Sequence, residues 1–219
     1  MGSVNRPVRD AAPVARTRGR PRLAEVAEID AQLLAAALAE FLQHGFGGAS
    51  MRSIAKAAGV SRTTLVARFA SKADLFRAIM TQQAARMAAT SALHAEGPPA
   101  LAQGLAAFGN RALAYSLEGD LLEINRLITS AAGQFPEVAA VVLDTTEAGM
   151  AQVAAFIARC AEADGVPCRD PAAVAECFIL ALRGWYGRVL LGGALPGAAE
   201  REAWVERMVE MLIAGRPGW

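Results

Sequence analysis

Residues 50–76 read SMRSIAKAAGVSRTTLVARFASKADLF, and this stretch decides the fold because serine recurs where helices can begin. A serine side-chain oxygen accepts hydrogen bonds from the free backbone amides at a helix start. The serines concerned are Ser50, Ser61 and Ser71. Gly59 stands where a left-handed residue can end the first of these helices. The pattern therefore predicts short helices over about 51–58 and 62–69, and a further helix after Ser71.

A longer helix is expected before this stretch. The segment AQLLAAALAEFLQHG, residues 31–45, places apolar side chains at helical spacing. Asp30 is expected to cap its first amides, and Gly45 to end it. Because isolated helices shorter than about a dozen residues are marginal in water, the short pair must pack on the longer helix. This arrangement is a helix-turn-helix, which inserts its second helix into the major groove of DNA.

The second short helix carries residue types that recognise DNA. Leu65 and Phe69 lie four residues apart and are expected to point inward. The residues left outside are Arg62, Thr63, Thr64, Ala67 and Arg68. Arginine pairs with guanine or clamps phosphate, and threonine offers a hydroxyl and a methyl group. No carboxylate occurs from Leu42 to Ala73, which favours DNA binding over the alternative of a plain basic hairpin.

Charge is distributed unevenly along the chain. The net charge is +1, yet residues 1–90 carry 13 Lys/Arg and 6 Asp/Glu, whereas residues 91–219 carry 9 and 15. This asymmetry indicates an N-terminal part that binds a polyanion. The apolar fraction of 54% is rich in alanine and lacks alternating strand patterns. The composition therefore favours an all-α fold.

The segment from Ile54 to Phe76 resembles the N-terminal domain of TetR-type transcriptional regulators, and the resemblance covers about residues 28–80. The family pattern runs roughly I-A-x-x-A-G-V-S-x-G-T-L-Y-x-H-F-x-S-K-x-x-L. The matching residues are Ile54, Ala55, Ala58, Gly59, Val60, Ser61, Thr64, Leu65, Phe69, Ser71, Lys72 and Leu75. The resemblance implies a three-helix DNA-binding domain, here over residues 23–75, joined to a helical ligand-binding and dimerisation domain over residues 76–219.

Three positions depart from the family pattern. Thr63 replaces the usual glycine, Val66 the usual tyrosine and Arg68 the usual histidine. In the family this tyrosine and histidine contact the DNA backbone. Val66 cannot donate a hydrogen bond, whereas Arg68 is a longer and permanently charged donor. The predicted DNA-binding residues are Arg18, Arg20, Arg52, Ser61, Arg62, Thr63, Thr64, Arg68 and Lys72.

Arg18 and Arg20 belong to a basic arm over residues 1–22. Its segment ARTRGRPRL contains RGRP, which resembles the AT-hook, an extended segment that lays arginines in a narrow minor groove. The alternative is a disordered tail that increases solubility.

Glycine and proline clusters divide the remainder into helices. After a continuation to about residue 95, the expected ranges are 99–117, 119–132, 137–163, 171–191 and 199–214. The segments NRLITSAAGQFPEVA and FILALRGWYGRVLLG resemble the AefR-like C-terminal domain of the TetR family. The resemblance implies about nine helices in all, with a dimer interface built from the last two.

One face of the helix predicted at 171–191 fits such an interface. Leu180, Gly184, Gly187 and Leu191 share a stripe. Two glycines on one helix face indicate the close approach of another backbone, because glycine otherwise costs helix stability. The final helix is expected to supply Trp204, Met208 and Met211. The alternative is ordinary packing within one chain.

A largely apolar effector pocket is predicted within residues 99–190, where large apolar side chains alternate with small alanines. Arg126 and Arg183 lie in otherwise apolar helices, so each needs a carboxylate partner or an acidic ligand. The prediction requires a cavity bordered by Phe178 and Trp185, and a fully packed core is the alternative. The predicted ligand-binding residues are Leu105, Phe108, Arg126, Phe135, Met150, Phe178, Ala181, Arg183, Trp185 and Tyr186.

These observations predict a regulator, acting as a repressor, that binds a palindromic operator as a homodimer and is released by a small, largely apolar effector. The alternatives are a DNA-binding architectural protein without an effector, a pure dimerisation module, and a small enzyme fused to a DNA-binding head. No phosphate loop, metalloprotease motif or nucleophile elbow supports the enzyme. Neither a cofactor nor a metal is expected.

The expected compartment is the cytoplasm. Cys160, Cys168 and Cys177 are odd in number and lack metal-type spacing, which fits a reducing environment. No secretory signal pattern follows the N-terminal arginines. The most apolar later stretch, residues 178–195, contains Arg183 and Arg188, so it is expected to be a buried helix rather than a membrane span.

Overall fold

Helices form the described structure throughout. The computed structural model describes residues 23–89 and 100–218, and within these ranges it contains nine α-helices, a short 3-10 helix and no strand. The predicted all-α fold is confirmed. The helices are α1 (Leu23–Gly48), α2 (Met51–Ala57), α3 (Arg62–Val66), α4 (Lys72–Ala89), α5 (Leu101–Leu117), α6 (Gly119–Ala131), α7 (Pro136–Asp164), α8 (Pro171–Leu190), α9 (Ala198–Ala214) and η2 (Arg216–Gly218).

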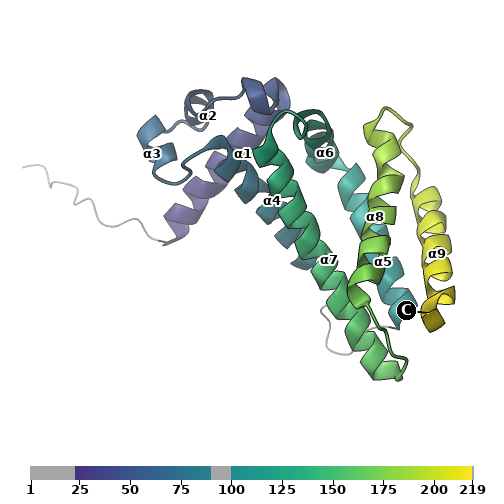
Figure 1. Cartoon of the computed structure of the whole chain (residues 1–219). Helices are drawn as coiled ribbons and strands as arrows, with labels where there is room; N and C mark the ends of the chain where they lie inside the picture. The colour runs from purple at the N-terminus through teal and green to yellow at the C-terminus, as the bar shows by residue number, and fades with distance from the viewer. Residues whose placement is uncertain (1–22, 90–99, 219) are drawn as a thin grey trace, which may run out of the picture.

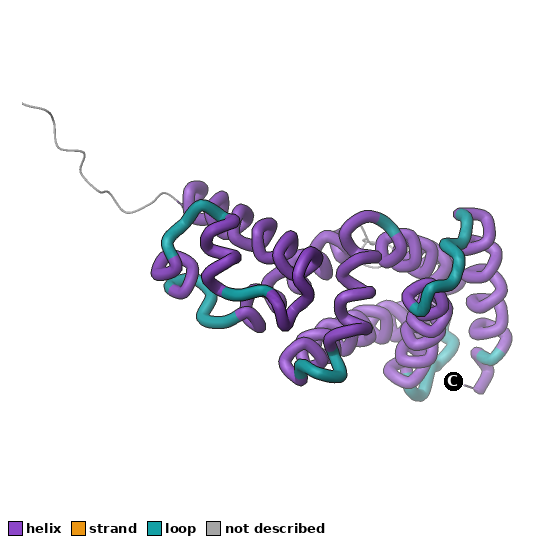
Figure 2. Tube along the Cα trace, turned by 90° about the horizontal axis from the view of Figure 1, so that it is seen from above, coloured by secondary structure: helices purple, strands orange, loops and turns teal. Residues whose placement is uncertain are grey.

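The helices form a head and a body. α1, α2 and α3 make up the head at one end of the molecule, and α4 to α9 make up the body (Figure 1). In the body, α7 packs on α4 and α8, while α5 packs on α8 and α9. Seen from above, the head projects to one side (Figure 2). α3 consequently lies at the end of the molecule farthest from α8 and α9.

The first helix begins earlier than predicted. α1 starts at Leu23, so Asp30 lies inside the helix and does not cap its first amides. The residues before Asp30 are mostly good helix formers, which explains why the helix extends through them. The predicted end at Gly45 is confirmed as a kink, because this residue has φ 68° and ψ 167°. A positive φ is unstrained only for glycine.

The three serine caps are confirmed. Ser50 Oγ accepts from the Ser53 amide at 3.0 Å, and Ser53 Oγ accepts from the Ser50 amide at 3.1 Å. This is a reciprocal capping box at the start of α2. Ser61 Oγ accepts from the Thr64 amide at 3.0 Å, and Ser71 Oγ accepts from the amide three residues on at 3.1 Å. The starts of α2, α3 and α4 therefore lie where the sequence predicted them.

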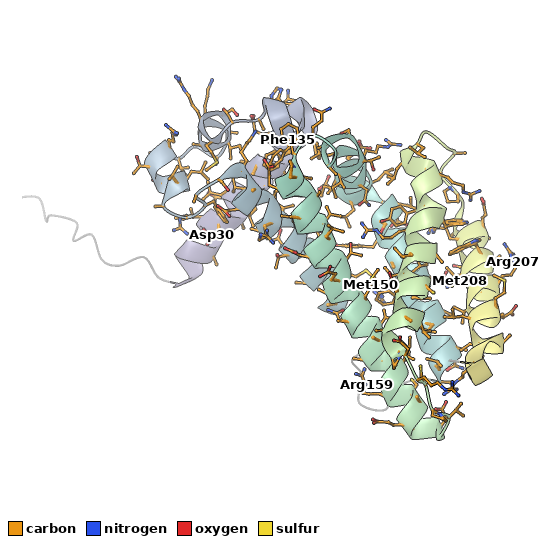
Figure 3. All side chains as sticks on the ribbon, viewed as in Figure 1. Asp30, Phe135, Met150, Arg159, Arg207 and Met208 are labelled. Atoms are coloured by element: carbon orange, nitrogen blue, oxygen red, sulfur yellow. The ribbon has the colours of Figure 1, made fainter. Side chains whose placement is uncertain are left out.

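Two clusters of buried side chains hold the molecule together. One lies within the body, among α5, α7, α8 and α9. The other joins the head to the body, because it combines α1 to α4 with Ile124 and Leu127 of α6 and Val138 of α7. At this junction the Phe46 and Phe135 rings lie 5.2 Å apart (Figure 3). The head thus shares a continuous core with α6 and α7.

α7 is a core helix despite its length. By length and composition alone it could cross a membrane. Its first turns contribute to the core between head and body, and its later residues Val153 and Phe156 are fully buried in the body. α8 also buries Phe178 and Leu182 in that core. The prediction that residues 178–195 include a buried helix is thereby confirmed.

Candidate DNA-binding surface and effector pocket

α3 presents its polar residues away from the core. Leu65 is fully buried beneath the helix, whereas Arg62, Thr63 and Thr64 are exposed. Thr64 Oγ1 lies 2.7 Å from Ser61 Oγ, so its hydroxyl takes part in the helix cap. Arg62 and Thr63 are therefore the side chains of α3 most available to base edges.

The neighbouring helix α2 adds two cations. Arg52 and Lys56 are exposed, and neither takes part in an ion pair within the described ranges. Val66 is 42% exposed and offers only apolar surface. α2 and α3 together form a basic surface without carboxylates, which is what contact with DNA phosphates requires.

Arg68 is less available than predicted, because it turns toward α1. Its Nη1 lies 2.5 Å from Asp30 Oδ1, and its side chain is 21% exposed. A helix of five residues needs such external support, since it cannot form stably alone. We therefore assign Arg68 the role of fixing α3 on α1.

Lys72 also serves the fold. Its Nζ donates to the carbonyl oxygens of Phe46 at 2.6 Å and Ala49 at 2.9 Å, with that of Gly47 at 3.5 Å. The ammonium also lies 4.8 Å from the centre of the Phe46 ring. The last carbonyls of a helix have no partner within it, and a lysine can satisfy them. Lys72 thus joins the end of α1 to the start of α4. The predicted arm residues Arg18 and Arg20 lie outside the described residues.

The body contains two hollows that share part of their lining. The first, the α5–α8 pocket, has a volume of about 180 Å³ and is lined by residues that include Phe108, Asn125, Ile128, Thr146, Arg183 and Tyr186. The second, the α7–α8 groove, has a volume of about 1060 Å³ and runs past Leu143, Met150, Leu180 and Gly184. Thr146 and Arg183 line both, so their contact separates the pocket from the groove. Met150 is labelled on α7 in Figure 3.

The predicted ligand-binding residues fall into separate groups. Phe108, Arg183 and Tyr186 line the α5–α8 pocket, and Met150 lines the groove. Phe178 and Trp185 border neither of these two hollows. Trp185 lines a separate hollow with Val189 and Leu195, but Phe178 does not, so the predicted cavity bordered by both is wrong. Phe178 packs against Phe108, and Trp185 stacks on Trp204 with ring centres 5.2 Å apart. Leu105 and Ala181 also lie in the packed body core.

Two further ligand assignments need correction. Phe135 belongs to the junction with the head, where it contacts Phe46. It precedes α7, and the start of that helix lies beside α1 rather than in the middle of the body. Arg126 forms an exposed ion pair with Glu123 at 2.8 Å and lines neither hollow. Glu123 thus supplies the carboxylate partner that Arg126 was expected to need.

The polar lining of the pocket was missed at the sequence level. Ser116, Asn125, Thr145 and Thr146 line it, although none was predicted to. The predicted lining consisted mainly of large apolar side chains, and these four residues are small or polar. Polar residues within mostly apolar helices could have indicated this lining. They are weak evidence, because a threonine hydroxyl in a helix often bonds to the backbone of its own helix, as those of Thr145 and Thr146 do here.

One face of α8 lacks a partner among the described residues. Leu180 is 49% exposed and Leu191 is 82% exposed. No atom would lie within 4 Å of a Cβ added at Gly184 or Gly187. By contrast, a Cβ at Gly104 would lie 2.1 Å from the Phe156 ring, so packing within the chain explains that glycine. Packing within the described part of the chain does not explain the glycines of the α8 face.

α9 exposes only some of the residues that were predicted to lie in the dimer interface. Met211 is 71% exposed, whereas Met208 is 6% exposed and lies in the body core. Met208 was predicted to contribute to the dimer interface, but it lies in the core of one chain, because the buried stripe of α9 runs through Val205, Met208 and Val209. Trp204 is partly covered by Trp185.

The cysteines show no arrangement for chemistry. Cys160 is buried, and burial raises the pKa of its thiol, which favours the unreactive protonated form. Within the described residues, no group of three His, Cys, Asp or Glu side chains could hold a metal ion.

Two family models match the chain. Residues 33–79 match the bacterial regulatory proteins of the tetR family, and residues 103–215 match the C-terminal domain of AefR-like transcriptional repressors. The molecule is thus a DNA-binding transcription regulator rather than an enzyme. It belongs to the TetR family, with an AefR-like body, as the sequence motifs indicated. Members of the family typically form dimers.

Solved structures share this fold. A protein from Pseudomonas aeruginosa PAO1 assigned as a transcriptional regulator is 25% identical, with a TM-score of 0.71 over 87% of this chain and 93% of that one. A protein from Mesorhizobium loti assigned to the TetR family is also 25% identical, with a TM-score of 0.69 over 86% and 96%. The flavonoid-responsive regulator FrrA is 26% identical, with a TM-score of 0.69 over 86% and 97%. No curated protein sequence matches the chain.

Proposed function

We propose that the protein is a cytoplasmic repressor that binds a palindromic operator as a homodimer and releases it when a small molecule enters the α5–α8 pocket. The observation that carries this proposal is the position of α6. Its residues Asn125 and Ile128 line the pocket, while Ile124 and Leu127 lie in the core shared with the head. A ligand that displaces α6 would therefore displace the head.

The operator contacts follow from exposure and charge. Arg62 and Thr63 are proposed to read base edges in the major groove, with Thr64 beside them. Arg52 on α2 is proposed to contact phosphate, as is Ser61 at the start of α3. Arg18 and Arg20 are proposed to enter the neighbouring minor groove. Arg68 is proposed to act through the position of α3, and Lys72 through the junction of α1 with α4.

A palindromic site requires two heads held about one helical turn apart. The exposed stripe of Leu180, Gly184, Gly187 and Leu191 is the proposed contact between subunits, together with Met211 of α9. A contact of this kind is self-complementary about a two-fold axis. It would give the two glycines the close backbone neighbour that they lack within one chain.

An effector can release the operator only if it binds the conformation that releases DNA more tightly than the conformation that binds DNA. FrrA, which shares the fold, is a flavonoid-responsive regulator. This similarity supports a small-molecule effector for the present protein. An architectural DNA-binding protein without an effector would need no pocket beside α6. The pocket therefore favours the regulator.

The proposal is tested by selecting operator sequences from random duplex DNA with the full-length protein and then measuring affinity by fluorescence anisotropy. Arg62→Ala should cost about 1–3 kcal/mol on the selected site and relax the preference at one base pair in each half-site. Arg169→Ala is the matched control, since Arg169 is exposed in the loop between α7 and α8, at the far end from the head. Equal affinity of both variants for the selected site would overturn the assignment of α3.

A further inference from the structure

Arg183 differs from the paired arginines of this molecule. In the described ranges Arg68, Arg77, Arg126, Arg201 and Arg216 each pair with a carboxylate. Arg183 has no carboxylate within 4.0 Å in those ranges, and its guanidinium donates to the hydroxyl oxygen of Thr146. It is partly buried where the α5–α8 pocket meets the α7–α8 groove. A partly desolvated charge without a counter-charge is costly unless a ligand supplies one.

The polar groups around Arg183 favour a ligand that accepts hydrogen bonds. The hydroxyls of Thr145 and Thr146 donate to the carbonyls of Val141 and Val142, at 2.8 and 2.7 Å. Their protons are thus engaged, and only their lone pairs face the pocket. Arg183 keeps several N–H donors, because only one is used by Thr146. A ligand that reaches it must bring acceptor atoms.

Much of the remaining lining is apolar, with Ser116, Asn125 and Tyr186 as its other polar residues, and it limits the size of the ligand. Phe108, Ile128 and Leu182 come from three helices and form much of the wall. The pocket volume is about 180 Å³. A cavity of about 150 Å³ lined by apolar side chains holds one benzene molecule. The α5–α8 pocket therefore has room for roughly one six-membered ring with a small substituent.

We propose that the effector is a monocyclic aromatic carboxylate whose ring fills the α5–α8 pocket and whose carboxylate pairs with Arg183 in place of Thr146. The proposal rests on the proposed function and names the chemical class that the pocket takes. A carboxylate matches the fork of N–H donors on a guanidinium and neutralises its charge. The ring would contact Ile128 on α6, the helix whose other face packs on the head.

The test uses full-length protein without DNA and two probes of the same shape. Benzoate carries the carboxylate, and benzamide replaces it with a neutral amide. By isothermal titration calorimetry, benzoate should bind the wild-type protein at least about tenfold more tightly than benzamide, since hydrogen bonds between charged groups are the stronger ones. This comparison requires no variant and therefore does not depend on the folding of one.

Two variants assign the preference to a residue. Arg183→Gln should lower the affinity for benzoate by about tenfold or more, to the affinity of the wild-type protein for benzamide. Arg126→Gln should leave benzoate binding unchanged, because Arg126 lines neither hollow. Circular dichroism establishes that both variants are folded before titration.

The proposal is overturned if benzoate does not bind, if benzamide binds equally well, or if Arg183→Gln retains benzoate binding. None of these results affects operator binding, which is measured separately. If benzoate binds through Arg183 but leaves the selected operator bound, the anion site stands and the proposed release mechanism is wrong.

Discussion

Arg68, which follows the end of α3, donates a hydrogen bond to Asp30 of α1 across 38 residues of sequence. This contact holds a five-residue helix against a helix of 26 residues. α3 buries only Leu65 and packs on α2, so this contact adds a second support from α1. A side chain that the sequence assigned to DNA therefore supports the helix whose residues we propose to face DNA.

The first prediction separates these two roles of Arg68. Arg68→Gln and Asp30→Asn should each weaken operator binding, and the double variant should be no weaker than the single ones. The interaction energy from a double-mutant cycle is typically about 0.5–3 kcal/mol for two residues joined by an ion pair. Anisotropy with the selected operator measures all four proteins. If Asp30→Asn binds normally while Arg68→Gln does not, Arg68 contacts DNA directly.

The second prediction concerns Lys72. Lys72→Met should lower the free energy of unfolding by about 1–3 kcal/mol, because carbonyl oxygens at the end of α1 lose a charged donor. Urea unfolding measures this loss. The salt dependence of operator binding should stay unchanged, since the ammonium already contacts carbonyl oxygens. A salt slope reduced by about one unit would instead show that Lys72 binds phosphate.

The third prediction tests the α8 face. Gly184→Leu should shift the protein toward monomer in sedimentation and weaken operator binding with it, because the added side chain separates two closely packed backbones. No atom of residues 23–89 or 100–218 lies within 4 Å of the new Cβ, so the fold of the monomer should be unaffected. Ala84→Leu on the exposed side of α4 is the control and should remain dimeric. An unchanged dimer for Gly184→Leu would place the interface elsewhere.

The fourth prediction concerns the junction between head and body. Phe135→Ala should loosen the contact with Phe46 and speed amide hydrogen exchange in residues 45–49, with a loss of stability of about 1–4 kcal/mol. Phe135→Leu should restore most of the protection, since it refills much of the volume. Benzoate binding should persist in both, because Phe135 does not line the pocket. Unchanged exchange in residues 45–49 would show that the junction does not hold the kink of α1.

The fifth prediction is a pH dependence at the end of α7. Arg216 donates to both carboxylate oxygens of Asp164, at 2.9 and 3.0 Å, and these hydrogen bonds hold the pKa of Asp164 below its usual range. A carboxyl pKa that is lower in the folded state stabilises the fold above the unfolded pKa, and the effect is lost as pH falls through the folded value. Asp164→Asn should therefore lower the Tm at pH 7, and the difference from wild type should shrink below about pH 4. A difference that is the same at pH 7 and pH 3 would contradict this origin.

Local chemistry explains what could be predicted from the sequence. The caps at Ser50, Ser61 and Ser71 and the break at Gly45 depend on neighbouring residues within one turn. Helix existence and approximate bounds follow from such signals together with apolar spacing. The motif from Ile54 to Leu75 was sufficient to indicate the family, because its residues build the caps, turn and short helices of the helix-turn-helix.

Contacts between distant segments could not be predicted in the same way. The sequence placed Asp30 at a helix start and Arg68 outside, yet their pairing depends on how α3 crosses α1. Trp185 and Phe178 were expected beside a cavity, but Trp204 and Phe108 pack against them. Periodicity identifies a buried face without showing which neighbour fills it.

The sequence by itself determined the helices, their order and the basic helix-turn-helix, because these depend on capping, spacing and charge within short segments. Only the tertiary structure decided which cations remain available and where space is left. Lys72 and Arg68 are engaged by α1, whereas Arg183 faces a pocket without a carboxylate beside it in the described part of the chain. The availability of a charge depends on the packing of several helices around it, and no single segment contains that information.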